Sequence, residues 1–184
     1  MRLRTNTVLI FLTLGLLFTA NLSGAQSSPP SEYQLKAAFL YNFAKFTDWP
    51  ADAFANAQAP FIIGILGENP FGSDLERTVA GKTIAEHPMT IRMFRTPTDA
   101  TNCHILFINP AEKERFPAIF QSLRGTTVLT VSQTEHFIEA GGMVNFVEEA
   151  NKIRFEINAE AAKVARLKIS SRLLGLAVRS AAAP

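Results

Sequence analysis

Short, continuous apolar runs place the strongest constraint on the fold of this chain. TVLTVS (127–132) predicts one of the strands. FIIGILG (61–67) and HILFIN (104–109) are continuous apolar runs, rich in β-branched and aromatic residues. Runs of this length are typical of strands that are buried on both faces of a parallel sheet. TIRMFR (90–95) alternates enough to form a further strand. Because amphipathic segments separate these strands, the sequence predicts an α/β sandwich with a largely parallel sheet.

Helices are expected to flank this sheet. Bulky residues at helical spacing predict a long amphipathic helix over 33–48, ended by Pro50. A loop and a short helix should follow the first strand, with Pro70 starting the helix and Gly81 closing it. Further helices are expected at 111–124 despite Pro117, at 159–168, and after Ser170 or Ser171 as a cap.

The last two strands should form a hairpin. MVNFVEE and KIRFEIN are separated only by Ala150 and Asn151, which is too short a connection for parallel neighbours. In the second strand the apolar and charged residues alternate, which is typical of a strand with one face in water. The expected fold is therefore a three-layer α/β sandwich with a mostly parallel sheet, a C-terminal antiparallel hairpin and flanking helices.

The N-terminus has the pattern of a secretory signal peptide. Arg2 and Arg4 precede an apolar run over 8–18, and small residues at 23–25 offer a cleavage site. We expect a cleaved leader over 1–25, a disordered Pro-rich lead-in over 26–31, and a single domain over 32–180 that is exported to the periplasm. No later apolar segment reaches the roughly 18 residues of a membrane helix, so no membrane span is expected after cleavage.

Charge and cysteine content narrow the function. Without Arg2 and Arg4, the chain has 16 basic and 16 acidic residues. A neutral domain without a run of Lys or Arg gives no electrostatic reason to bind nucleic acid. Cys103 is the only cysteine, so no disulfide is expected within the chain. We expect it to be a small buried hydrophobe rather than a redox or dimer-linking thiol.

Motifs for catalysis and cofactor binding are missing from the sequence. There is no G-x-S-x-G, and the spacing of His87, His104 and His136 places no two of them on one helical turn. GENPFG (67–72) follows the first strand but matches neither the dinucleotide pattern nor the P-loop pattern. Two glycines at 141–142 predict a bend before a strand rather than a ligand site. We expect no catalytic residue, no metal and no cofactor.

Aromatic residues are concentrated in the helix over 33–48 and just beyond it. Two interpretations remain open. Either the helix is buried on two sides, or some of its aromatic residues form an exposed surface that binds a partner. The six residues are Tyr33, Phe39, Tyr41, Phe43, Phe46 and Trp49.

An ordered set of segments resembles the YfiR-like family. These segments are KAAFLYNFAKFTDWP (36–50), FIIGILGENPFG, CHILFIN (103–109), VLTVS followed by FIEAGGMVNF (137–146), and IRFEINAEAA leading to LKISSRLLGLA. The resemblance implies a periplasmic α/β sandwich, often a homodimer, that represses an inner-membrane diguanylate cyclase by contact with its periplasmic sensor domain. It further implies control of cyclic di-GMP and biofilm formation, no enzymatic activity, and release through capture by an outer-membrane peptidoglycan-linked lipoprotein.

The chain departs from the family pattern in its cysteines. The best-known pattern includes disulfide-linked pairs, whereas here only Cys103 stands in a matching place and the first strand carries Ile62 and Ile63. Redox control by internal disulfide exchange is therefore not expected.

With this resemblance in hand, we expect a contact surface for a partner or ligand on the aromatic helix and the last strand with its exit. The alternative is that the helix aromatics belong to the core and the charges form a solvated face. The candidate residues are Tyr41, Lys45, Trp49, Glu156, Lys168, Ser170 and Arg172.

Two functions of other classes stay open. The first is a periplasmic small-molecule sensor or carrier, in which Glu156 and Lys168 bind an amino-acid-like ligand as a charge pair suited to a zwitterion. The second is a periplasmic enzyme, although no nucleophile, base and orienting group can be assembled from the sequence.

Overall fold

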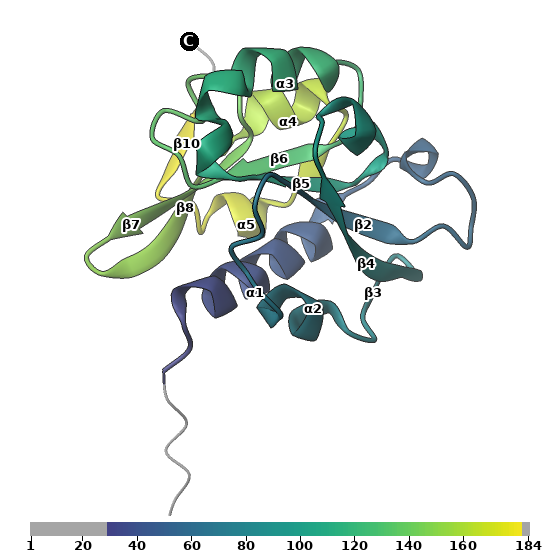
Figure 1. Ribbon diagram of the computed structural model, residues 1–184, viewed down its shortest axis with the longest axis horizontal. Coiled ribbons are helices and arrows are strands. Elements are labelled where there is room, and N and C mark those ends of the chain that lie inside the picture. The colour runs from purple at the N-terminus through teal and green to yellow at the C-terminus, as the bar shows by residue number, and fades with distance from the viewer. Residues whose placement is uncertain (1–28, 182–184) are drawn as a thin grey trace, which may run out of the picture.

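One twisted sheet organises the part of the chain that the computed structural model describes, residues 29–181 (Figure 1). The strand order is β10-β8-β7-β6-β5-β2-β4-β3. Neighbours from β4 to β7 are parallel, β8 is antiparallel to β7, and β10 is parallel to β8. The mostly parallel sheet is thereby confirmed. Its strands are β2 (Phe61–Leu66), β3 (Thr83–Ile84), β4 (His87–Phe94), β5 (Ile105–Ile108), β6 (Leu129–Ser132), β7 (Val144–Glu149), β8 (Lys152–Asn158) and β10 (Arg179–Ala181).

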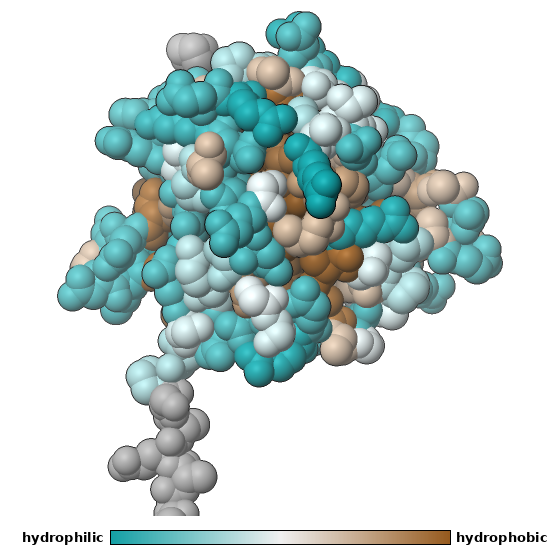
Figure 2. All heavy atoms as spheres, viewed as in Figure 1, coloured by the Kyte–Doolittle hydropathy of each residue, from teal (hydrophilic) through white to brown (hydrophobic). Residues whose placement is uncertain are grey.

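Helices cover both faces of the sheet. In Figure 1, α1, α2 and α5 lie below the sheet, and α3 and α4 lie above it. The helices are α1 (Glu32–Lys45), α2 (Asp74–Val79), α3 (Phe116–Ser122), α4 (Ala159–Val164) and α5 (Ser171–Leu174), with 3-10 turns η1 (Ala51–Ala53), η2 (Thr98–Asn102) and η3 (Pro110–Arg115). The three-layer α/β sandwich expected from the sequence is confirmed. In the view of Figure 2, hydrophilic residues cover most of the surface, and hydrophobic residues show mainly between the upper and lower helices.

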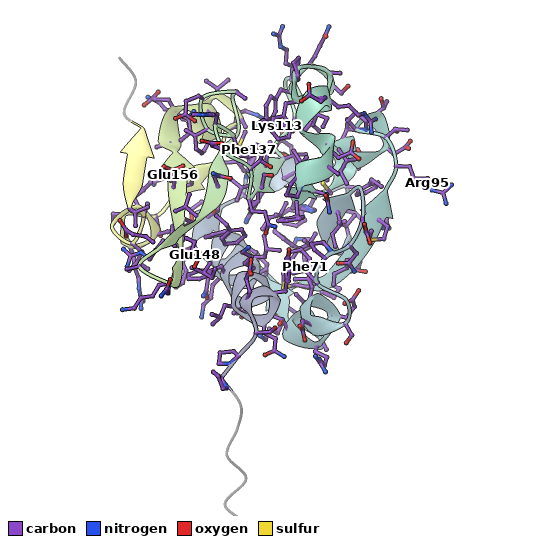
Figure 3. The ribbon with its side chains drawn as sticks, turned by 60° about the vertical axis from the view of Figure 1, so that its left-hand side comes forward. Phe71, Arg95, Lys113, Phe137, Glu148 and Glu156 are labelled. Atoms are coloured by element: carbon purple, nitrogen blue, oxygen red, sulfur yellow. The ribbon has the colours of Figure 1, made fainter. Side chains whose placement is uncertain are left out.

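Each face of the sheet has its own core because side chains alternate along a strand. Ile63 and Ile65 of β2 pack toward α1, in a cluster that includes Phe71. Ile62 of β2 packs on the other face, in a cluster that includes Phe137. Figure 3 shows Phe71 and Phe137 on opposite sides of the sheet. All six residues of β2 are buried, as the apolar run predicted.

Helix α1 begins as a capping box and ends earlier than the sequence predicted. The Ser31 side chain accepts a hydrogen bond from the Gln34 amide, and the Gln34 side chain accepts one from the Ser31 amide. The helix ends at Lys45 instead of residue 48. The reason is tertiary: Thr47 and Asp48 form strand β1 (Thr47–Asp48), which pairs with β9 (Lys168–Ile169).

The C-terminal hairpin has the expected register. Val144 lies opposite Ile157, and Glu149 lies opposite Lys152. The two turn residues, Ala150 and Asn151, have φ of 51° and 59°. Positive φ at both central residues is the feature of a type I′ turn, whose twist matches that of the strands. The hairpin prediction is confirmed.

Other expected helices differ in extent. The segment over 111–124 is the 3-10 turn η3 followed by α3, because Pro117 lies in the first turn of α3 and offers no N–H to a helix continuing from before it. Pro70 lies in a turn, and α2 begins only at Asp74. The helix expected at 159–168 ends at Val164, and Lys168 belongs to β9.

The two glycines before β7 form the expected bend. Gly141 has φ of +108°, which favours glycine. Gly142 is required for a different reason, since a Cβ there would lie 2.2 Å from Cε1 of Phe137. The backbone therefore approaches the aromatic ring more closely than any other residue type permits.

Candidate functional site

The end of α1 and the segment from β9 to α5 are joined through backbone hydrogen bonds. In the two-stranded sheet, Asp48 pairs with Lys168. Beyond it, the Ser170 amide donates to the Phe46 carbonyl over 3.0 Å. Residues that are far apart in the sequence thus form one continuous surface.

Two cations on this surface lie near the same aromatic ring. The Arg172 guanidinium carbon is 5.2 Å from the centroid of the Phe46 ring, and Lys45 Nζ is 5.8 Å from it. Lys45 and Arg172 are exposed, whereas Phe46 is half-buried. Neither cation makes an ion pair within residues 29–181. Both charges therefore stay available to an acidic partner.

A further aromatic and cation pair extends this surface along α1. Tyr41 precedes Lys45 by four residues, so the two side chains lie on one face of the helix. Lys82, in the loop after α2, places its Nζ 4.1 Å from the centroid of the Tyr41 ring. We call this set of residues the cationic surface: Tyr41, Lys45, Phe46, Lys82, Lys168 and Arg172.

Sequence reasoning named Phe46 among six aromatic residues of which some could bind a partner, but did not include it among the candidate site residues, and it missed Lys82 altogether. Phe46 was grouped only with the other aromatic residues of its helix. Lys82 lies in a loop with no motif, and its proximity to Tyr41 depends on how α2 packs against α1. No signal in the local sequence marks Lys82.

Ser170 and Trp49 have structural contacts of their own. Ser170 caps α5, because its Oγ accepts a hydrogen bond from the Leu173 amide over 3.3 Å. Trp49 is half-buried, donates from Nε1 to the Ala44 carbonyl over 3.0 Å, and packs edge-on against Phe61 with centroids 5.0 Å apart. Trp49 therefore anchors the chain after α1 to the core, and only part of its side chain is accessible to a partner.

Glu156 lies apart from the other candidates. Phe155 and Ile157 on either side of it are buried in the cluster that packs against α1. Alternation along β8 directs the half-buried Glu156 to the opposite face of the sheet. No ion pair joins it to Lys168 in the part of the chain that the structure describes. The structure brings Lys45, Lys168, Ser170 and Arg172 together, and it places Glu156 on another face.

Lys168 also borders a groove of about 460 Å³ between α4 and α5. Its charged lining comprises Glu160, Lys163, Arg166 and Lys168, and Glu156 is not part of it. Apolar lining comes from Leu167 and other aliphatic residues. An acidic group beside several cations can bind a zwitterion. In this groove the acidic group is Glu160, whereas the sequence predicted Glu156.

His87 and His104 lie against the same ring, that of Phe54, whereas His136 lies elsewhere on the surface. His87 stacks on Phe54 with centroids 3.7 Å apart, and His136 is exposed beside Glu135. His104 is buried, and its Nδ1 accepts a hydrogen bond from the Ile62 amide over 3.0 Å. Burial lowers the pKa of His104 to about 4, opposed in part by the Ala53 carbonyl. Within residues 29–181, no three His, Cys, Asp or Glu side chains are grouped to hold a metal ion.

Cys103 is a buried thiol at the start of β5, as expected. It is 4% exposed, and burial raises the pKa of the thiol far above its usual range. Because the thiolate is the reactive form, Cys103 is inert at neutral pH.

Two loops meet at the carboxyl edge of the sheet, at the place where similar folds bind ligands. Successive strands move in opposite directions from β2, so the switch point lies between β2 and β5. There the Asn109 side chain donates to the Glu68 carbonyl over 2.8 Å. A Cβ at Gly67 would lie 3.0 Å from Cβ of Asn109, so the two loops are in direct contact. The two loops are thus held together at the switch point.

Among the described residues, none of the helices combines the length and the apolar character that a membrane crossing needs. The proposed leader over 1–25 and most of the lead-in lie outside the described residues.

Comparisons with known proteins support the sequence interpretation. A family model described as YfiR/HmsC-like matches residues 33–178. No curated protein matches the chain significantly. The fold is similar to the crystal structure of a conserved domain protein from Vibrio cholerae O1 biovar El Tor strain N16961, with a TM-score of 0.56 and 10% identity. The match covers 84% of this chain and 62% of that one, so the chain spans less than two thirds of its neighbour, and at this identity the likeness concerns the fold alone.

Proposed function

Because the chain belongs to the YfiR/HmsC-like family, we propose that it is a periplasmic repressor of an inner-membrane diguanylate cyclase. Members of this family are periplasmic and regulatory rather than catalytic. In this proposal the chain binds the periplasmic sensor domain of the cyclase and so lowers cyclic di-GMP and biofilm formation.

The observation that supports the proposal is the cationic surface. Lys45 and Arg172 lie near one half-buried ring, and neither has an ion-pair partner in the part of the chain that the structure describes. Arginine and aromatic residues are enriched in protein interfaces, and unpaired cations favour an acidic partner. We infer that the sensor domain presents carboxylates around an apolar contact for Phe46.

Repression by such a contact requires no reaction. The repressor must bind the inactive arrangement of the sensor domain more tightly than the active one. Each tenfold difference in affinity shifts the equilibrium by about 1.4 kcal/mol. Release then requires only a competitor for the same surface, and an outer-membrane peptidoglycan-linked lipoprotein is the competitor that we propose.

Deletion and complementation test this function. Deleting the gene should raise cellular cyclic di-GMP, and the wild-type gene should restore the original level. Arg172→Glu should accumulate normally but fail to restore it. The matched control is Arg95→Glu, which makes the same charge change at an exposed residue that points away from the molecule after β4 (Figure 3). Full restoration by Arg172→Glu, or unchanged cyclic di-GMP on deletion, would contradict the proposal.

The groove beside Lys168 favours a second candidate function, the sensing of an amino-acid-like ligand. Lys163 and Lys168 offer cations to a carboxylate, and Glu160 offers a carboxylate to an ammonium group. A panel of the standard amino acids should then raise the melting temperature of the wild type but not of Lys168→Ala. A flat response across the panel would exclude this candidate.

A further inference from the structure

A second cavity, of about 830 Å³, lies at the edge of the sheet opposite the switch point. Its floor includes Ile62 near the start of β2 and Cys103 just before β5. One wall is formed by the segment that links η1 to β2, which projects beside the start of β2 at the right of Figure 1. The other walls come from residues 125–127 before β6 and from Arg92 of β4. None of its lining residues belongs to the cationic surface.

The charges of this cavity leave one cation unpaired. Arg166 Nη1 contacts Asp52 Oδ2 over 2.7 Å, so these two lining residues compensate each other. Arg92 also lines the cavity and has no ion-pair partner within residues 29–181. His104 adds no charge near neutral pH, because burial lowers its pKa to about 4. The cavity therefore presents one uncompensated guanidinium.

Uncharged polar groups make up much of the remaining lining. The side chains of Gln58, Asn102 and Thr127 line the cavity and make no hydrogen bond within the described part of the chain. These amide and hydroxyl groups can both donate and accept. They suit a ligand that carries several hydroxyl groups rather than an apolar chain.

The back of the cavity contains a donor without a well-placed acceptor. The His104 ring lies between Phe54 and Phe61, with centroids 4.6 Å and 4.5 Å away. Because Nδ1 accepts from the Ile62 amide, the proton of the neutral ring is on Nε2. Nε2 is buried and makes no hydrogen bond of normal geometry in the described residues, and the Ala53 carbonyl nearby offers it only a weak contact. Such a donor costs stability unless a well-placed acceptor reaches it.

We propose that this cavity binds a small hydroxylated organic acid, with Arg92 holding its carboxylate and the neighbouring amide and hydroxyl side chains binding its hydroxyl groups. A guanidinium pairs with a carboxylate through two parallel hydrogen bonds. A single unpaired cation matches a singly charged acid better than a phosphate dianion. The volume lies within the range typical of small-molecule sites.

The only tryptophan of the chain gives a direct binding signal. The Trp49 ring is 5.8 Å from His104, which lines the cavity. We would titrate the purified protein with D-glucuronate and D-gluconate and follow Trp49 fluorescence. D-glucose tests the need for the carboxylate, hexanoate tests the need for hydroxyl groups, and inorganic phosphate tests the class of anion. The variants are Arg92→Ala and, as a matched control, Arg95→Ala.

The proposal predicts a saturable change with at least one hydroxylated acid in the wild type and in Arg95→Ala. Arg92→Ala should weaken binding about tenfold or more while its melting temperature stays near that of the wild type. Glucose, hexanoate and phosphate should bind at least about tenfold more weakly than the acid. Equal binding by Arg92→Ala, a preference for phosphate or hexanoate, or no response to either acid up to about 10 mM would overturn the proposal. The repressor function would be unaffected by that result, because it rests on a different surface.

Discussion

The guanidinium of Arg172 lies 5.2 Å from the centre of the Phe46 ring, across the junction between α5 and the end of α1. This pair joins two parts of the chain that the sequence separates widely, and the backbone bond from Ser170 to Phe46 fixes their position. Phe46 is partly buried and Arg172 is exposed, so the guanidinium is held against the ring and is still accessible to solvent. We expect this pair to contribute little to the stability of the fold, and we propose that it binds the partner protein.

The two candidate residues Arg172 and Trp49 should differ sharply in their effect on stability. Arg172→Ala removes an exposed cation–π contact and should lower the free energy of unfolding by no more than about 1 kcal/mol. Trp49→Ala removes a ring that packs on Phe61 and a hydrogen bond to Ala44, and should cost about 3–5 kcal/mol. Urea unfolding measures both. A large loss for Arg172→Ala would place that residue in the structural framework instead of the interface.

Gly142 should not tolerate a methyl group. A Cβ there would lie 2.2 Å from the ring of Phe137, which is fully buried, so Gly142→Ala should cost about 1–3 kcal/mol. Gly175→Ala is the control, since its nearest neighbour would be 3.4 Å away. Thermal unfolding of both variants checks this, and equal melting temperatures would mean that the Phe137 ring can move aside at little cost.

Stability should fall as the pH decreases from about 6.5 to about 4, in part because of His104. An unfolded histidine takes up a proton near pH 6.5, whereas the buried His104 resists protonation until about pH 4. Over this range the unfolded state binds more protons, so acid favours unfolding, by about 3 kcal/mol at pH 4. Above pH 6.5 neither state binds the proton, and this contribution is absent.

His104→Asn separates this effect from the protonation of carboxylates. Its side-chain oxygen can still accept from the Ile62 amide, but the residue does not titrate. Urea unfolding at pH 7 and pH 4.5 should show a smaller acid-induced loss for the variant than for the wild type. Identical losses would show that His104 does not carry the pH dependence.

Lys36 should be easier to replace than its partner Gln133. The Lys36 ammonium is buried, donates to Gln133 Oε1 over 2.6 Å, and pairs with Glu32. Gln133→Leu removes an acceptor from a buried charge and should cost about 1–3 kcal/mol. Lys36→Met removes the charge itself and should change the free energy of unfolding by less than about 1 kcal/mol. A greater loss for Lys36→Met in urea unfolding would contradict this order.

The parts of the fold that the sequence predicted are those whose burial determines their composition. Strands β2 and β5 are buried on both faces, so they consist of apolar residues. These residues form continuous apolar runs that can be recognised in the sequence. The hairpin could be predicted because a two-residue connection allows only antiparallel neighbours. The short strands β1 and β9 have two residues each, which is too few for any periodic signal.

The candidate site could be predicted only in part. Lys45, Lys168 and Arg172 came from the resemblance to a family, and the structure places them near one another. Lys82 and Arg92 depend on tertiary packing: the first on the contact between α2 and α1, the second on which face of β4 borders a cavity. Alternation in the sequence predicted that Glu156 lies on the polar face of its strand, but it could not show that Lys168, in the two-residue strand β9, lies elsewhere.

The most direct test of the repressor function is a binding titration between the purified protein and the periplasmic domain of each membrane diguanylate cyclase in the same organism, by isothermal calorimetry. We predict that one of these domains binds the wild type and Arg95→Glu with equal affinity, and that Arg172→Glu binds it at least about tenfold more weakly. The affinity should also fall as salt is added, because the contact is made by exposed charges. If no such domain binds, or if Arg172→Glu binds as tightly as the wild type, the cationic surface is not the site of repression.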